Sequence, residues 1–142
     1  AFGEAPLVII ENHHNFAWKE TLATGEEVVI HRKGATPAGI GDIGVIPGTM
    51  ASPAFIVGGK GNEESLNSAS HGAGRKMSRN VAVKDLSGKQ MKEYLDSRRI
   101  ELLGAGTDES PFAYKDIHEV MDYQKDLVEI LGTFHPAIVR MA

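Results

Sequence analysis

Glycine and proline divide the middle of this sequence so finely that only short helices and strands can form there. The 142 residues include 16 glycines and 6 prolines, which are dense in the run GATPAGIGDIGVIPGTMASP at residues 34–53. Glycine favours turns and proline removes a backbone donor, so we expect this run to be mostly loop, with a short strand at 43–46. Such loops are where site residues tend to lie.

The apolar patterns elsewhere predict a single α+β unit. Short apolar runs predict strands at residues 6–10, 26–32, 54–59, 99–104 and 137–141. Ser87, with Gln90 three residues later, resembles a helix-capping pair and predicts a helix at 88–97. The clearest helix is expected at 116–131, where apolar residues recur at helical spacing before Gly132. A short helix is also expected at 63–70, whereas residues 11–20 fit neither period.

The composition is that of an ordinary globular domain, with 42% hydrophobic and 24% charged residues. The net charge of −4 argues against nucleic-acid binding through bulk charge, so such a contact needs the local cations at 31–33 or 75–79. There is no cysteine, and hence no disulfide or thiolate metal site within this sequence. No apolar run reaches the roughly 20 residues of a membrane span. Because the sequence enters an apolar run almost at once, we expect it to be part of a longer chain.

Three polar stretches leave alternatives open. In NHHN, residues 12–15, neighbouring histidines on a strand face opposite sides, so one of them is a metal ligand or both are surface residues. In HRKGATPA, residues 31–38, the cations at a strand end bind a phosphate or are simply solvated. In VIPGTMASP, residues 45–53, the Thr49 and Ser52 hydroxyls are candidates to contact a phosphate or a base edge. That last run lacks the spacing of a phosphate-binding or dinucleotide-binding glycine loop.

The stretch SASHGAGRKMSR, residues 68–79, places one histidine, His71, before two glycines and three cations. A neutral imidazole can attack phosphorus if fixed donors hold the developing negative charge. We expect the amides of Gly72, Ala73 and Gly74 and the guanidinium of Arg75 to be those donors. The alternative is a helix start with a surface histidine, although a cationic first turn opposes the helix dipole.

SPFAYKDI, residues 110–117, places an aromatic residue, Tyr114, just before the expected long helix. Tyr114 either stacks on a nucleotide base or covers the helix as a core residue. His13, His118 and His135 are expected to be structural.

Taken together, NHHN, VIHRKGATPA, VIPGTM, SASHGAGRKMSR and AYKDIHEVMD resemble, in this order, the RtcB family of RNA ligases. The resemblance implies the C-terminal catalytic portion, residues 1–142, of a larger fold of mixed sheets, flanking helices and long glycine-rich active-site loops. It also implies a cytoplasmic enzyme that uses GTP and Mn²⁺ to join an RNA 3′-phosphate or 2′,3′-cyclic phosphate to a 5′-hydroxyl through a histidine–GMP intermediate. The missing N-terminal part would supply most of the metal ligands.

The resemblance assigns a role to individual residues. It makes His71 the nucleophile and His14 a metal ligand. The implied nucleotide contacts are Asn15, Thr49, Met50, Ser52, Gly72, Ala73, Gly74, Tyr114 and Arg140. The residues implied to face RNA or nucleotide phosphates are Lys33, Arg75 and Arg79. Two departures from the family pattern affect recognition of guanine: Ala54 stands where many members have a serine, and Arg140 is the nearest residue to the lysine with which many members end. A non-catalytic nucleotide- or RNA-binding paralogue and a metal-dependent phosphoesterase are the alternatives.

Overall fold

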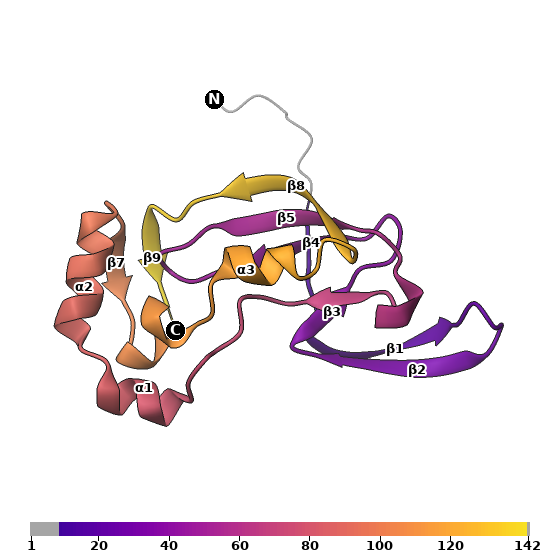
Figure 1. Ribbon diagram of the computed structural model, residues 1–142, viewed down its shortest axis with the longest axis horizontal. Coiled ribbons are helices and arrows are strands. Elements are labelled where there is room, and N and C mark those ends of the chain that lie inside the picture. Colours follow the sequence, from indigo (N-terminus) through magenta and orange to yellow (C-terminus); the bar gives the residue numbers. More distant parts are fainter. Residues whose placement is uncertain (1–8, 142) are drawn as a thin grey trace.

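The computed structural model describes residues 9–141 of the chain, and four small sheets form within them (Figure 1). Strands β1 (Asn15–Thr21) and β2 (Glu27–Lys33) make an antiparallel hairpin, β3 (Ala35–Pro37) pairs with β6 (Ser68–Ser70), and β7 (Glu101–Gly104) runs parallel to β9 (Ile138–Arg140). The largest sheet has the antiparallel order β4 (Ile43–Pro47), β5 (Ala54–Gly59) and β8 (Val128–Phe134). The structure is therefore mixed α and β, as the sequence predicts.

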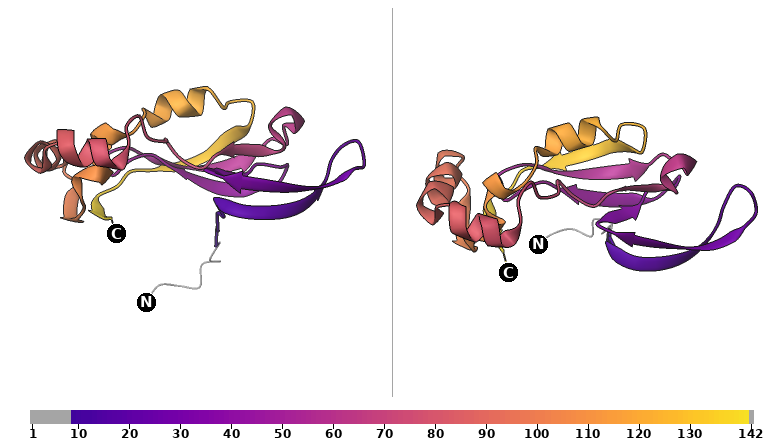
Figure 2. Two further views of the ribbon diagram at one scale, coloured as in Figure 1. Left: turned by 90° about the horizontal axis from the view of Figure 1, so that it is seen from below. Right: turned by 60° about the horizontal axis from the view of Figure 1, so that its bottom comes forward.

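Three α-helices accompany these sheets within the described residues. They are α1 (Arg79–Asp85), α2 (Gly88–Ser97) and α3 (Ile117–Asp122). Figure 2 shows α3 lying across one face of the β4–β5–β8 sheet, while α1 and α2 gather at the end of the molecule opposite the β1–β2 hairpin. The main core lies beneath α3, where Ile46, Phe55 and Val57 of the sheet meet Ile117 and Met121 of the helix.

A second, smaller core lies beneath α2 and joins Met50, Met91, Leu95 and Ile100. Because Met50 follows β4, this core ties the loop after β4 to the helical end of the molecule. The loop is thereby held between two packed regions, which fixes one wall of the site described below.

Most of the predicted strands are confirmed, with ends shifted by a few residues: 26–32, 43–46, 54–59, 99–104 and 137–141 correspond to β2, β4, β5, β7 and β9. Helix α2 spans the predicted residues 88–97, and the Ser87 hydroxyl accepts from the Gln90 amide at 3.4 Å. The strand expected at 6–10 lies largely outside the described residues, and Ile9 and Ile10 are not in a strand.

Two helix predictions are wrong. The helix expected at 116–131 ends at Asp122, residues 123–127 form a turn, and strand β8 then begins at Val128 and pairs with β5 as the third strand of the main sheet. The helix expected at 63–70 is one 3₁₀ turn, Glu63–Ser65, followed by β6. Strands β1 and β3 and helix α1 were not predicted, since β1 carries an exposed aromatic and polar sequence without a clear apolar face.

Candidate functional site

A glycine between β2 and β3 brings two histidines together. Gly34 adopts a φ of +70°, which lets the chain turn from one small sheet into the next. Its amide donates to the His14 carbonyl at 2.9 Å, and its carbonyl accepts from the His71 amide at 3.2 Å. The two imidazole rings therefore lie face to face at a tilt, with centroids 4.1 Å apart. Residues 57 positions apart in the sequence share one site, as the resemblance implies.

The environment of His71 keeps its ring neutral. Partial burial, and then the charge of the neighbouring His14, lower the pKa of His71 from its ordinary value of 6.5. At pH 7 the ring therefore keeps a nitrogen lone pair. That state is the one in which an imidazole acts as a nucleophile or as a metal ligand.

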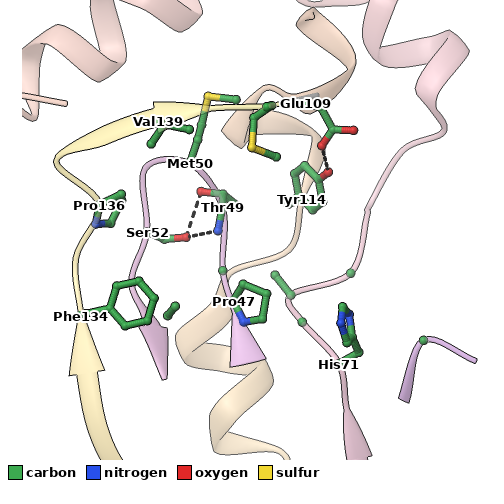
Figure 3. Close-up of a pocket in the computed structure, with 17 residues that line it drawn as sticks. Pro47, Thr49, Met50, Ser52, His71, Glu109, Tyr114, Phe134, Pro136 and Val139 are labelled. Carbon is green, nitrogen blue, oxygen red and sulfur yellow. Dashed lines mark hydrogen bonds between the residues drawn. The ribbon is translucent and has the colours of Figure 1, made fainter. Parts of the chain in front are cut away.

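His71 lies at the edge of an apolar cavity of about 510 Å³ (Figure 3). The predicted nucleotide-contact residues that line this cavity are Thr49, Met50, Ser52, Gly72, Ala73, Gly74 and Tyr114. Its remaining lining residues are Gly34, Pro47, Gly48, Ala54, Glu109, Phe134, Pro136, Val139 and Met141. The volume and the apolar walls are those of a small-molecule site.

The turn after β4 forms one wall of this cavity and is held by its own hydroxyls. Ser52 Oγ accepts from the Thr49 amide at 2.6 Å and lies 2.9 Å from Thr49 Oγ1 (Figure 3). Gly48 is required in this turn, because a Cβ there would lie 2.4 Å from Ser52 Oγ and 2.6 Å from the Pro53 carbonyl oxygen. The two hydroxyls that the sequence offers to a ligand are thus bonded to the turn itself.

A neighbouring wall is the glycine loop after His71, and one of its three amides is already used. The Ala73 amide donates to the Pro47 carbonyl at 3.1 Å, and Ala73 is buried. The expectation of three exposed amides is therefore wrong for Ala73, because the loop needs this bond to pack against the end of β4. A Cβ at Gly72 would lie 3.0 Å from the same carbonyl oxygen, so a larger residue there would push that carbonyl away by a few tenths of an ångström.

A buried carboxylate organises the far end of the cavity. Glu109 is 8% exposed, and it accepts from the Tyr114 hydroxyl and from Arg79. Arg75 lies 3.7 Å from Glu109, donates to the Tyr114 oxygen at 3.0 Å, and also donates to the backbone carbonyls of Met77 and Asp108. Burial, followed by the bond to Glu109, raises the pKa of Tyr114 above 10.0.

The five other predicted ligand-facing side chains do not line the cavity. Arg75 and Arg79 are held by the carboxylates and carbonyls of residues 108–109, so they must exchange partners to bind a phosphate. Lys33 and Arg140 are exposed. The exposed Asn15 shares a hydrogen bond of 3.1 Å with His31 Nε2.

The cation cluster at 31–33 is partly structural. Arg32 is only 2% exposed, and it binds Glu20, the Ser68 hydroxyl and the Leu66 carbonyl. Its guanidinium also lies 5.2 Å from the Trp18 ring centroid. Arg32 therefore joins the β1–β2 hairpin to the start of β6 and is not available to a ligand.

The other histidines lie apart from this site. His13 packs against Phe16 and Trp18, with ring centroids 5.5 and 6.4 Å away, and the exposed His118 meets the Phe55 ring edge-on. Among residues 9–141, no three His, Asp or Glu side chains come together in a way that holds a metal ion. An exposed imidazole such as that of His14 is a suitable single donor for a divalent transition metal.

The sequence reasoning missed Glu109 and the wall formed by Phe134, Pro136, Val139 and Met141. Glu109 stands in a polar run that matches no motif. What marks it as a site residue is its burial and its bonds to Arg79 and Tyr114, and these become visible only in the folded structure. Val139 and Met141 fall in the predicted closing strand, whereas Phe134 and Pro136 lie outside every predicted element, and no sequence period shows that β8 and β9 lead past the cavity.

The structure thus defines a class of protein: an α+β fold in which a pair of histidines lies beside an apolar cavity with a glycine loop in its wall. The family model described as tRNA-splicing ligase RtcB matches residues 3–142. This chain belongs to the RtcB family.

Named relatives agree with this assignment. The chain is 46% and 45% identical over 129 residues to the RNA-splicing ligases RtcB1 and RtcB of two Escherichia coli strains, and these matches cover 91% of the chain. It is 36% identical over 141 residues to the tRNA-splicing ligase RtcB of Methanococcus maripaludis, a match that covers 84% of the chain. The chain spans only 31%, 31% and 29% of the length of these three relatives. In the part of the chain that the structure describes, every helix is too short or too polar to cross a membrane.

Proposed function

We propose that this chain carries the histidine nucleophile and much of the nucleotide pocket of an RNA ligase. The enzyme uses GTP and Mn²⁺ to join an RNA 3′-phosphate or 2′,3′-cyclic phosphate to a 5′-hydroxyl. Family membership supports the reaction class. The observation that carries the proposal is the neutral His71 ring, which lies at the edge of an apolar cavity and 4.1 Å from the His14 ring.

In the proposed reaction, a ring nitrogen of His71 attacks the α-phosphorus of GTP. An N–P bond forms, the bond from phosphorus to the bridging oxygen breaks, and pyrophosphate leaves with the electron pair. An oxygen of the RNA 3′-phosphate then attacks the same phosphorus, and the N–P electron pair returns to His71. Finally the 5′-hydroxyl attacks the RNA phosphorus, loses its proton and releases GMP. A 2′,3′-cyclic end must first take up water to give the 3′-phosphate.

The residues around the cavity suit the binding of a nucleotide. Phe134 and Tyr114 offer aromatic surface to a base, and the amides of Gly72 and Gly74 lie beside His71 where phosphate oxygens would be. Arg75 directly follows this loop and Arg79 comes five residues after Gly74. Both add positive charge when a phosphate displaces their carboxylate and carbonyl partners.

The proposed metal site is incomplete in this chain. His14 would hold Mn²⁺ through one imidazole nitrogen, and the other ligands would come from parts of the protein outside these 142 residues. When bound, the metal supplies positive charge that offsets the charge of the phosphates. Within this chain, His14 presents its ring next to His71, because the backbone of Gly34 is hydrogen-bonded to both residues.

Mass spectrometry of the full-length protein after incubation with GTP and Mn²⁺ tests the proposal. We expect a covalent GMP adduct that is absent from His71→Ala and retained by His13→Ala, since His13 packs against Phe16 and Trp18 and lies outside the cavity lining. An adduct that persists in His71→Ala would contradict the assignment of the nucleophile. Nucleotide binding without any adduct would favour a non-catalytic nucleotide-binding paralogue. Release of phosphate from the RNA without joining would favour a metal-dependent phosphoesterase.

A further inference from the structure

A second cavity, of about 450 Å³, shares a wall with the first. Thr49, Ser52 and Tyr114 line both cavities, and all three are labelled in Figure 3. Much of the remaining lining of the second cavity comes from α2 and its C-terminal end, the 3₁₀ turn at Pro111–Ala113, and the start of α3. A polymer held in the second cavity would therefore lie directly beside the proposed nucleotide site.

The second cavity is positively charged. Lys76, Arg98 and Lys115 line it, and its one carboxylate, Asp116, caps α3 by accepting from the His118 amide at 2.9 Å. The imidazoles of His118 and His135 add further donors. Within residues 9–141, no salt bridge or side-chain hydrogen bond engages the three cations.

Three arginines elsewhere in the chain have carboxylate partners, whereas the cations of the second cavity have none among the described residues. Arg75 and Arg79 are bound to Glu109 or Asp108, and Arg32 is bound to Glu20. The chain as a whole carries a net charge of −4. On a protein with a negative net charge, binding of a polyanion requires a local cluster of positive charge. The three unpaired cations in this cavity form such a cluster.

Aromatic rings accompany these cations. The Tyr94 and Phe112 rings lie 4.9 Å apart, and the Arg98 guanidinium lies 4.5 Å from the Tyr94 centroid. A guanidinium stacked on a ring is held in one orientation, and its N–H edge stays available to phosphate oxygens. Cations interleaved with aromatic side chains are typical of surfaces that bind single-stranded nucleic acid without reading its sequence.

We propose that the second cavity binds the single-stranded RNA segment that precedes the 3′-phosphate. This inference rests on the proposed function. Arg98, Lys76 and Lys115 contact the phosphates of that segment, and the RNA end passes Tyr114 to reach His71. The shared wall explains how one side chain, Tyr114, contacts both the nucleotide and the RNA path.

Fluorescence anisotropy of a labelled, 3′-phosphorylated single-stranded RNA, measured without GTP, tests this site in the full-length protein. The variants are Arg98→Gln and Lys115→Gln, alone and combined, and Lys92→Gln is the control, because Lys92 is an exposed residue of α2 outside the cavity. We expect the double variant to bind about tenfold more weakly, with a log–log salt slope shallower by about 1.4, since each single-strand phosphate contact contributes about 0.7. Lys92→Gln should bind like the unchanged protein.

Two results would overturn the proposal. One is unchanged RNA affinity and salt slope in the double variant. The other is a polyglutamate peptide that binds as tightly as the RNA and loses affinity equally in the double variant, which would mark a general polyanion or acidic-peptide site. Formation of the GMP adduct is measured separately and does not depend on these residues. Failure of the RNA site and failure of the nucleophile assignment are thus distinguishable.

Discussion

Glu109 is a buried carboxylate shared by Arg79, Arg75 and the Tyr114 hydroxyl. Replacing it by glutamine keeps the shape but removes the charge that both guanidinium groups face. We expect Glu109→Gln to lower the free energy of unfolding by about 2 kcal/mol, because a partly buried cation loses its partner. Urea denaturation measures this. Asp108→Asn, which affects only the exposed Arg79, should cost less, and equal losses would contradict a central role for Glu109.

The Tyr114 phenol should lose its proton later than an ordinary tyrosine. Burial and the bond to Glu109 raise its pKa, so the folded protein holds this proton at pH values above 10.0, where the unfolded chain has lost it. The resulting stability is present below pH 10 and is lost as the pH rises through the folded pKa. Ultraviolet titration should show one late tyrosine that disappears in Tyr114→Phe. A late phase that survives this substitution would refute the assignment.

At the scale of elements, the junction of β2 and β3 holds both histidines of the site. Gly34→Ala meets no atom within 4 Å of the new Cβ, so its cost comes from the φ of +70° alone. We expect a loss of about 1 kcal/mol in the free energy of unfolding, and slower formation of the GMP adduct. Gly34→Asn is the matched variant, because asparagine tolerates this conformation better. Equal effects of the two substitutions would show that the backbone conformation is not the cause.

The switch from α3 to β8 shows where local pattern fails. Ile117, Val120 and Met121 face the sheet from one short helix, whereas Val128 and Ile130 pair with β5. The apolar residues of both elements happen to continue one helical period, so periodicity alone predicts a single helix. The open edge of β5 decides the outcome, because a third strand satisfies its backbone groups. That edge becomes visible only after the sheet is known.

Gln124 fixes this switch. It is 4% exposed, and its side-chain oxygen accepts from the Ser70 amide and hydroxyl, each at 3.0 Å. We expect Gln124→Ala to lower the free energy of unfolding by about 2 kcal/mol, since it leaves two partly buried Ser70 donors without an acceptor. Because Ser70 precedes His71, adduct formation should slow as well. Tyr123→Ala, at a side chain that is 81% exposed, is the control and should be close to neutral in urea denaturation.

At the scale of the whole molecule, the sequence motifs predict many of the residues that line the cavity, but not the residues that complete its walls. His71, the glycine loop and the Thr49–Ser52 turn are contiguous runs with recognisable chemistry, and the fold places all of them on one cavity. Glu109, Phe134 and Met141 come from segments without such a signal. The engagement of Arg75 by its neighbours was also beyond prediction, because a hydrogen-bond partner depends on packing and not on residue type.

The outer surface of the molecule bears on what these 142 residues can do alone. The β8 side chains of Ile130, Leu131 and Phe134 are each more than half exposed, and the chain spans about 31% of its Escherichia coli relatives. The described residues offer no set of three metal ligands. We therefore expect the isolated 142-residue chain to join no RNA when GTP and Mn²⁺ are present, whereas an Escherichia coli relative serves as the positive control. Ligation by the isolated chain, detected on a denaturing gel, would show that His14 and His71 need no ligands from elsewhere.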